Sequence, residues 1–232
     1  MSYAEFLAKK DRLDKPSGFD PGDAMNQKLF PFQRAIVRWA CRRGRAAVWA
    51  DCGLGKTLIA LEWARLVCEQ ERGSAIILTP LAVAEQFAEE GRKFGIAVNV
   101  CKSGDDLREG INVTNYERIH RFDLSAMTAV VLDESSILKD YSSATRNTLI
   151  ETFARTPYRL ACTATPSPND HIELGNHAEF LGALTRTEML STFFVHDGGE
   201  TQSWRLKRHA AADFWRWICS FAVVLRKPSD LG

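Results

Sequence analysis

The residues best suited to chemistry lie in one short stretch of the 232-residue chain, AVWADCGLGKTLIALEW. An apolar run is followed by a loop with Gly53 and Gly55, then by Lys56 and Thr57, and then by apolar residues at helical spacing. A loop that joins a buried strand to a helix presents backbone N–H groups, backed by the helix dipole, to an anion. Glycines let the backbone wrap closely, Lys56 would reach the β and γ phosphates, and the Thr57 hydroxyl would hold magnesium. The stretch therefore predicts a site for a nucleoside triphosphate.

The phosphate-loop pattern G-x-x-x-x-G-K-[ST] is only partly met, because Ala50 stands at the position of its first glycine. The remaining core is still specific when it lies between a strand and a helix. The alternative is a flexible turn that carries a surface lysine. We predict that the loop contacts nucleotide through Cys52, Gly53, Leu54, Gly55, Lys56 and Thr57.

Two adjacent carboxylates, Asp133 and Glu134, follow another apolar run. At the end of a buried strand, one carboxylate can join the magnesium shell and the other can activate an attacking water. Acidic residues also end strands without such a role, so the pair gains its weight from the phosphate loop upstream. A third strand is predicted to end near Thr163 and Thr165, whose hydroxyls would sense the γ-phosphate or simply end the strand before Pro166.

The elements that must position these residues alternate along the chain. Helical patterns at 31–44, 56–70, 81–94 and 142–154 are interspersed with continuous apolar runs that we predict to be strands. Buried strands that alternate with helices indicate an α/β fold, in which a parallel sheet has helices on both faces. The predicted strands are AAVWA, AIILTP, AVNVC, INVT, AVVLDE and YRLACTAT.

The two ends of the chain follow a different pattern. Residues 2–11 are predicted to form a short helix, and the Pro- and Gly-rich segment after it an irregular arm. Beyond Pro168, NDHIELGNHAEFLGAL and HAAADFWRWICSFAVV are both predicted to be helical, with a polar segment between them. The last residues, RKPSDLG, have the composition of a linker.

Composition excludes several classes of protein. Thirty basic and twenty-nine acidic residues give a formal charge of +1, so any nucleic-acid surface must be a local patch. The apolar runs are too short to span a membrane, and the N-terminus lacks the apolar region of a secretory signal. The six cysteines include no CxxC pair, which argues against a zinc ribbon or a disulfide framework and favours a reducing cytoplasm.

Six blocks of the sequence resemble, in order and spacing, the motifs of superfamily-two helicases. They are LFPFQRAIV, DCGLGKT, ILTPLAVAEQF, TNYE, DESS and CTATPSPND. The Swi/Snf-like branch is the most similar, and ELGNHAEFLG, FFVHD and RKPSDLG resemble DEAD/DEAH-type helicases of phages and prophages. The resemblance implies a P-loop NTPase with a RecA-like sheet. It suggests an arm at 1–28, an ATP-binding first lobe at 29–185, a helical extension at 186–225 and the start of a linker at 226–232.

The resemblance also implies roles for individual residues. Gln33 would read the adenine edge, with Phe30 or Phe32 packing on the base. Asp133 and Thr57 would hold magnesium, Glu134 would activate water, and Lys56 would act on the phosphates. Coupling to nucleic acid would run through Thr163 and Thr165 to a track formed by Pro80, Leu81, Thr114, Asn115 and Tyr116. One departure is that Ser135 and Ser136 follow the carboxylates, where the branch commonly has Ala-Asp or Ala-His.

Helicases of this type use two RecA-like lobes, and the second supplies an arginine finger. Only the first lobe is recognisable here, so the resemblance implies a chain that binds ATP and Mg²⁺, hydrolyses ATP slowly, and needs a second lobe in cis or in trans. Its other partner would be nucleic acid, with DNA favoured, in the cytoplasm of a bacterium or a phage-infected host. The alternative is a non-catalytic half-module that acts only with a partner lobe. A small-molecule kinase is disfavoured because the blocks stand in helicase order.

Two further patterns have ordinary explanations. His171 and His177 are six residues apart and would face different sides of a helix, which disfavours a metal site. The basic segments CRRGR and WRLKRH suit a nucleic-acid surface, but each has an ordinary explanation. Arginines at a helix C-terminus explain the first, and solvated cations beside an apolar helix explain the second at least as well.

Overall fold

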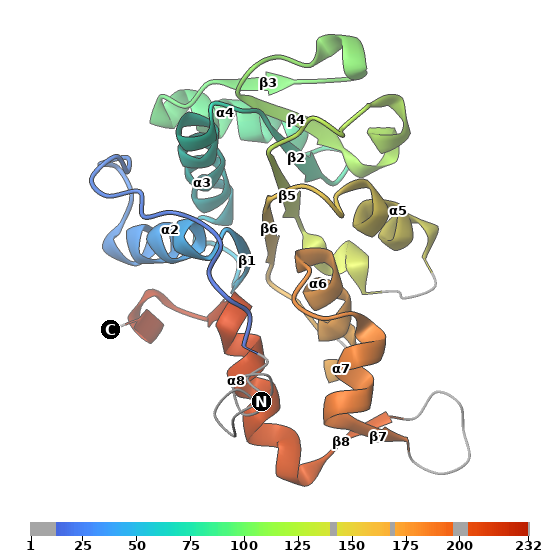
Figure 1. Cartoon of the computed structure of the whole chain (residues 1–232). Helices are drawn as coiled ribbons and strands as arrows, with labels where there is room; N and C mark the ends of the chain where they lie inside the picture. The colour runs from blue at the N-terminus through green and yellow to red at the C-terminus, as the bar shows by residue number, and fades with distance from the viewer. Residues whose placement is uncertain (1–12, 140–142, 168–169, 197–203, 232) are drawn as a thin grey trace, which may run out of the picture.

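The computed structural model describes residues 13–139, 143–167, 170–196 and 204–231. Its centre is a seven-stranded parallel sheet in the order β3-β4-β2-β5-β6-β1-β9 (Figure 1). A separate antiparallel pair, β7 and β8, lies apart from it. The strands are β1 (Arg45–Ala50), β2 (Ala75–Thr79), β3 (Val98–Val100), β4 (Ile111–Asn115), β5 (Ala129–Asp133), β6 (Tyr158–Thr163), β7 (Phe194–His196), β8 (Trp204–Leu206) and β9 (Ala222–Leu225).

Helices cover both faces of the sheet. In Figure 1, α2 and α3 lie on one side of it, whereas α5 and α6 lie on the other. This arrangement confirms the predicted α/β class. The helices are α2 (Pro31–Arg43), α3 (Lys56–Glu71), α4 (Ala84–Phe94), α5 (Ala144–Thr152), α6 (Leu174–Leu181), α7 (Arg186–Phe193) and α8 (Ala211–Phe221).

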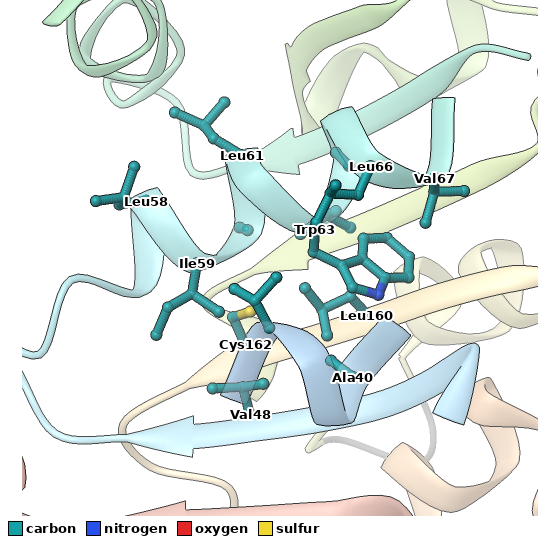
Figure 2. Packing of buried hydrophobic residues seen from close by; sticks show 14 of the residues in the cluster. Ala40, Val48, Leu58, Ile59, Leu61, Trp63, Leu66, Val67, Leu160 and Cys162 are labelled. Carbon is teal, nitrogen blue, oxygen red and sulfur yellow. The ribbon is translucent and has the colours of Figure 1, made fainter. Parts of the chain in front are cut away.

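Alternate residues of each strand enter one of two hydrophobic cores. In β1, Val48 packs into the core below α2 and α3, whereas Trp49 packs into the core formed with α6 and α8. Figure 2 shows Leu160 beside Trp63, which is fully buried at the centre of α3, and Val48 below Cys162 in the same core. Because both faces are covered, the strands contain continuous apolar runs rather than an alternation of apolar and polar residues.

The structure confirms the six predicted strands and corrects the C-terminal prediction. The segment HAAADFWRWICSFAVV is not helical throughout, because α8 ends at Phe221 and Ala222–Leu225 form β9. This strand pairs in parallel with β1, so residues 222–225 belong to the main sheet rather than to a helical extension. The helix predicted at 2–11 lies outside the described residues. None of the helices in the described ranges is long and apolar enough to cross a bilayer.

Candidate nucleotide site

The loop between β1 and α3 has the backbone that its glycines predict. Gly53 and Gly55 both have positive φ values, +83° and +75°, a region that L side chains rarely adopt. The Lys56 ammonium donates to the carbonyl oxygen of Ala50 at 2.9 Å and to that of Asp51 at 3.4 Å. The lysine is therefore folded back over the loop, next to the first turn of α3, where backbone N–H groups are available for an anion.

The phosphate loop and the two carboxylates line the same cleft. Its volume is about 690 Å³, which is a suitable size for a small-molecule ligand. The structure thus brings together groups that lie far apart in the sequence, as the motif positions predict. The lining residues are Lys28, Phe30, Gln33, Cys52, Gly53, Gly55, Lys56, Thr57, Leu58, Val83, Gln86, Glu90, Phe94, Asp133 and Glu134.

Asp133 and Glu134 have different environments. Asp133 is buried at the end of β5. Burial and the adjacent charge of Glu134 raise the pKa of the Asp133 carboxyl to about 6, and the Lys56 ammonium opposes that rise. Glu134 is half-buried and has a left-handed backbone, with φ +52°. Oxygen donors of this kind, together with the Thr57 hydroxyl in the same cleft, are the ligands that Mg²⁺ prefers, so the residues fit that ion.

The threonine block at the end of β6 contacts this pair directly. The Thr163 hydroxyl donates to a carboxylate oxygen of Glu134 at 3.2 Å and accepts the Thr165 backbone N–H at 3.1 Å. Thr163 is fully buried, whereas Thr165 is exposed. A hydrogen-bonded path therefore joins the carboxylate to the loop after β6, although Ser135 and Ser136 depart from the usual pattern.

Gln33 is held within the protein by both ends of its amide. Its side-chain oxygen accepts the Phe30 N–H at 3.0 Å, and its nitrogen donates to the Leu54 carbonyl at 3.2 Å. Gln33 is thus a brace for the phosphate loop, a role that the motif resemblance did not suggest. Phe30 is 65% exposed at the cleft and stacks on Phe32, with 6.2 Å between ring centroids, so it presents an open aromatic face.

The segments predicted to contact nucleic acid divide into buried and exposed members. Thr114, Asn115 and Tyr116 are buried, and the Tyr116 hydroxyl donates to the Asp133 backbone carbonyl at 2.7 Å. Because these three side chains are buried, they offer little exposed surface, and their contact with nucleic acid stays a prediction. Leu81 is 65% exposed and Pro80 is half-buried, so the loop after β2 is the accessible member of the set.

One contact at the site had no signal in the sequence. His177, from α6, lies 3.1 Å from the Ser135 hydroxyl, and both residues are completely buried. Their separation along the chain leaves no local pattern from which the pair could be predicted. In the described ranges, no group of three or more His, Cys, Asp and Glu residues is placed to hold a metal.

A parallel sheet with a glycine-rich loop before its α3 helix, and with strand-end carboxylates in the same cleft, defines a P-loop NTPase with a RecA-like core. The chain belongs to the DEAD/DEAH box helicase family, whose model matches residues 30–173. No curated protein sequence matches it.

Solved structures that share the fold include the following three. The Sulfolobus solfataricus SWI2/SNF2 ATPase core in complex with double-stranded DNA has a TM-score of 0.70 and 22% identity, over 90% of this chain and 46% of that one. The UvsW helicase from bacteriophage T4 has a TM-score of 0.56 and 15% identity, over 80% of this chain and 66% of that one. The Pyrococcus furiosus Hef helicase domain has a TM-score of 0.56 and 20% identity, over 67% of this chain and 37% of that one. The chain thus spans less than two thirds of each structure.

Proposed function

We propose that the chain is the ATP-binding motor lobe of a nucleic-acid-dependent ATPase, a helicase or translocase. The observation that carries this proposal is the single cleft shared by the phosphate loop and the two carboxylates. Membership of the DEAD/DEAH box helicase family favours ATP and Mg²⁺ as its ligands. The open face of Phe30 at the same cleft offers a stacking surface for the base.

Each group has a role that its position supports. The loop amides and Lys56 bind the phosphates, and Lys56 leaves its carbonyl partners to do so. Thr57 and Asp133 hold magnesium, which neutralises charge on the phosphate oxygens when bound. Glu134 orients and deprotonates the attacking water. Thr163 and Thr165 couple Glu134 to the exposed loop that follows β6.

DNA and a second RecA-like lobe are the proposed partners. The Sulfolobus solfataricus structure contains double-stranded DNA, and this chain spans 46% of it. An arginine finger from another lobe accelerates phosphoryl transfer by about 10³- to 10⁵-fold. We therefore expect the 232-residue chain to bind ATP and Mg²⁺ and to hydrolyse ATP slowly. The alternative is a non-catalytic half-module that holds nucleotide and DNA until a partner lobe docks.

Binding of a fluorescent ATP analogue to the purified chain, with and without Mg²⁺, tests the site. Lys56→Ala should weaken binding at least tenfold, whereas Glu134→Gln should bind normally and lose hydrolysis. Equal binding by wild type and Lys56→Ala would refute the proposed site. Turnover measured with and without DNA separates the two functions: slow hydrolysis above the Glu134→Gln background supports a motor lobe, and none supports the half-module. Brisk DNA-stimulated turnover would contradict the need for a second lobe.

A further inference from the structure

Glu134 has a backbone conformation that its own residue type does not favour. Arg72 and Glu134 are the non-glycine residues with positive φ in the described ranges, and Glu134 stands directly at the carboxylate site. Such a conformation persists only where the surroundings impose it. The 3₁₀ turn Ser135–Leu138 that follows must therefore be held by other parts of the fold.

Helix α6 contacts this turn at both of its ends. At the start, the His177 Nε2 atom lies 3.1 Å from the Ser135 hydroxyl. At the end, the Asn176 side-chain amide donates to the Lys139 carbonyl at 3.0 Å. Two neighbouring residues of one helix thus hold the turn, and the Ser135–His177 contact is completely buried, so water does not replace it.

His177 also contacts the strand that leads to the phosphate loop. Its ring packs edge-to-face against Trp49, with 5.6 Å between centroids. Trp49 immediately precedes Ala50, whose carbonyl accepts the Lys56 ammonium. Burial lowers the pKa of His177 to about 4, so the imidazole is neutral at physiological pH. One neutral side chain therefore lies between the two halves of the nucleotide site.

We propose that His177 is a positioning residue that, through Ser135, holds the Glu134 carboxylate in the geometry for water activation. Asn176 supports it by fixing the far end of the same turn. This inference rests on the proposed function and deepens it, since it assigns control of the carboxylate to α6. A packing role alone would not require a polar contact at each end of the turn.

Single-turnover ATP hydrolysis, with the 232-residue chain in excess over radiolabelled ATP, tests the proposal. His177→Leu should lower the rate on the order of tenfold while nucleotide affinity stays within twofold. His177→Gln, which keeps a side-chain hydrogen-bonding group, should restore part of the rate. Ser135→Ala should reproduce the His177→Leu defect, and the double variant should be no slower than either. His171→Leu is the matched control, because His171 is exposed and packs on Trp215.

Hydrogen exchange supplies a second readout that does not depend on turnover. His177→Leu should speed exchange at least several-fold in peptides that cover 133–139, whereas peptides from α3 should be unchanged. If wild type hydrolyses ATP faster than the Glu134→Gln background, an equal rate in His177→Leu and wild type would overturn the inference and leave the proposed function intact. Where wild type shows no turnover, unaltered exchange at 133–139 would overturn it. Failure of wild type to bind ATP would instead contradict the proposed function.

Discussion

The charged form of the buried Asp133 carboxyl lowers the stability of the folded chain. Its pKa is about 6 in the folded chain against 3.8 as the reference for the unfolded chain. The folded state therefore holds the proton more tightly, and the contribution of Asp133 to stability falls as pH rises between these two values. A shift of about two pKa units corresponds to roughly 3 kcal/mol, which is an upper estimate for this residue.

Asp133→Asn should accordingly stabilise the nucleotide-free protein at pH 7. We expect a gain of about 1–3 kcal/mol in the free energy of unfolding, because the buried charge is removed. The gain should shrink as pH falls from 7 to 4, where the wild-type carboxyl takes up its proton. Urea unfolding at several pH values measures both effects. Asp105→Asn, at an exposed position, is the control, and an equal gain at pH 4 and pH 7 would contradict the explanation.

The phosphate-loop residues and the carboxylate pair that line the candidate cleft were predictable because their spacing is local. The GLGKT core and the DE pair are each contiguous, and each follows an apolar run, so their types and positions could be inferred without tertiary structure. The hydrogen-bonding partners of Gln33 and Tyr116 could not be inferred in this way. Both side chains donate to backbone carbonyls inside the protein, and these contacts form only in the assembled fold.

At the scale of the elements, the two loop glycines have unequal surroundings. A Cβ atom at Gly55 would lie 2.4 Å from the side-chain nitrogen of Gln33, whereas a Cβ at Gly53 would meet nothing within 4 Å. Both have positive φ, so both substitutions carry backbone strain of roughly 1–2 kcal/mol. Only Gly55 adds a clash with the residue that braces the loop.

Gly55→Ala should therefore destabilise the nucleotide-free chain more than Gly53→Ala. We expect about 1–2 kcal/mol of additional loss, because Gln33 must give up its bond to Leu54. Chemical unfolding of both variants without nucleotide measures the difference. Combining Gly55→Ala with Gln33→Ala should reduce the excess, and equal losses for the two single variants would rule out the clash as its cause.

Strands were predictable where an apolar run stood between clear turns. The exception is β9, whose apolar residues directly continue the helical pattern of α8. Periodicity does not separate a short buried strand from the end of a buried helix. The strand is defined by its pairing with β1. Because β1 lies far from it in the sequence, no local pattern predicts this pairing.

At the scale of the whole molecule, the start of the described chain ties distant helices together. The Asp14 carboxylate pairs with Arg43 at the end of α2, and both side chains are at most 10% exposed. The Asp14 N–H donates to the Ser220 hydroxyl in α8 at 3.0 Å. The arm thereby links α2 to α8 across the edge of the sheet where β9 lies.

Arg43→Ala should consequently cost more stability than Arg42→Ala. Removing one partner of a buried pair leaves an uncompensated charge, for which we expect a loss of about 3 kcal/mol. Arg42 pairs with Asp20 at the surface, where the loss should stay below about 1 kcal/mol. Urea unfolding at pH 7 compares the two variants. A similar small loss in both would mean that the arm is not anchored by Arg43.

The position of β1 in the sheet has a consequence for biosynthesis. Its two hydrogen-bonding neighbours, β6 and β9, both come from the last third of the sequence. A nascent polypeptide leaving the ribosome therefore exposes β1 as an unpaired, apolar edge long before either neighbour exists, which is a state prone to aggregation. Cellular nucleotide cannot rescue that early species, since its binding pocket does not yet exist. Shielding of apolar segments by a chaperone would lower that risk.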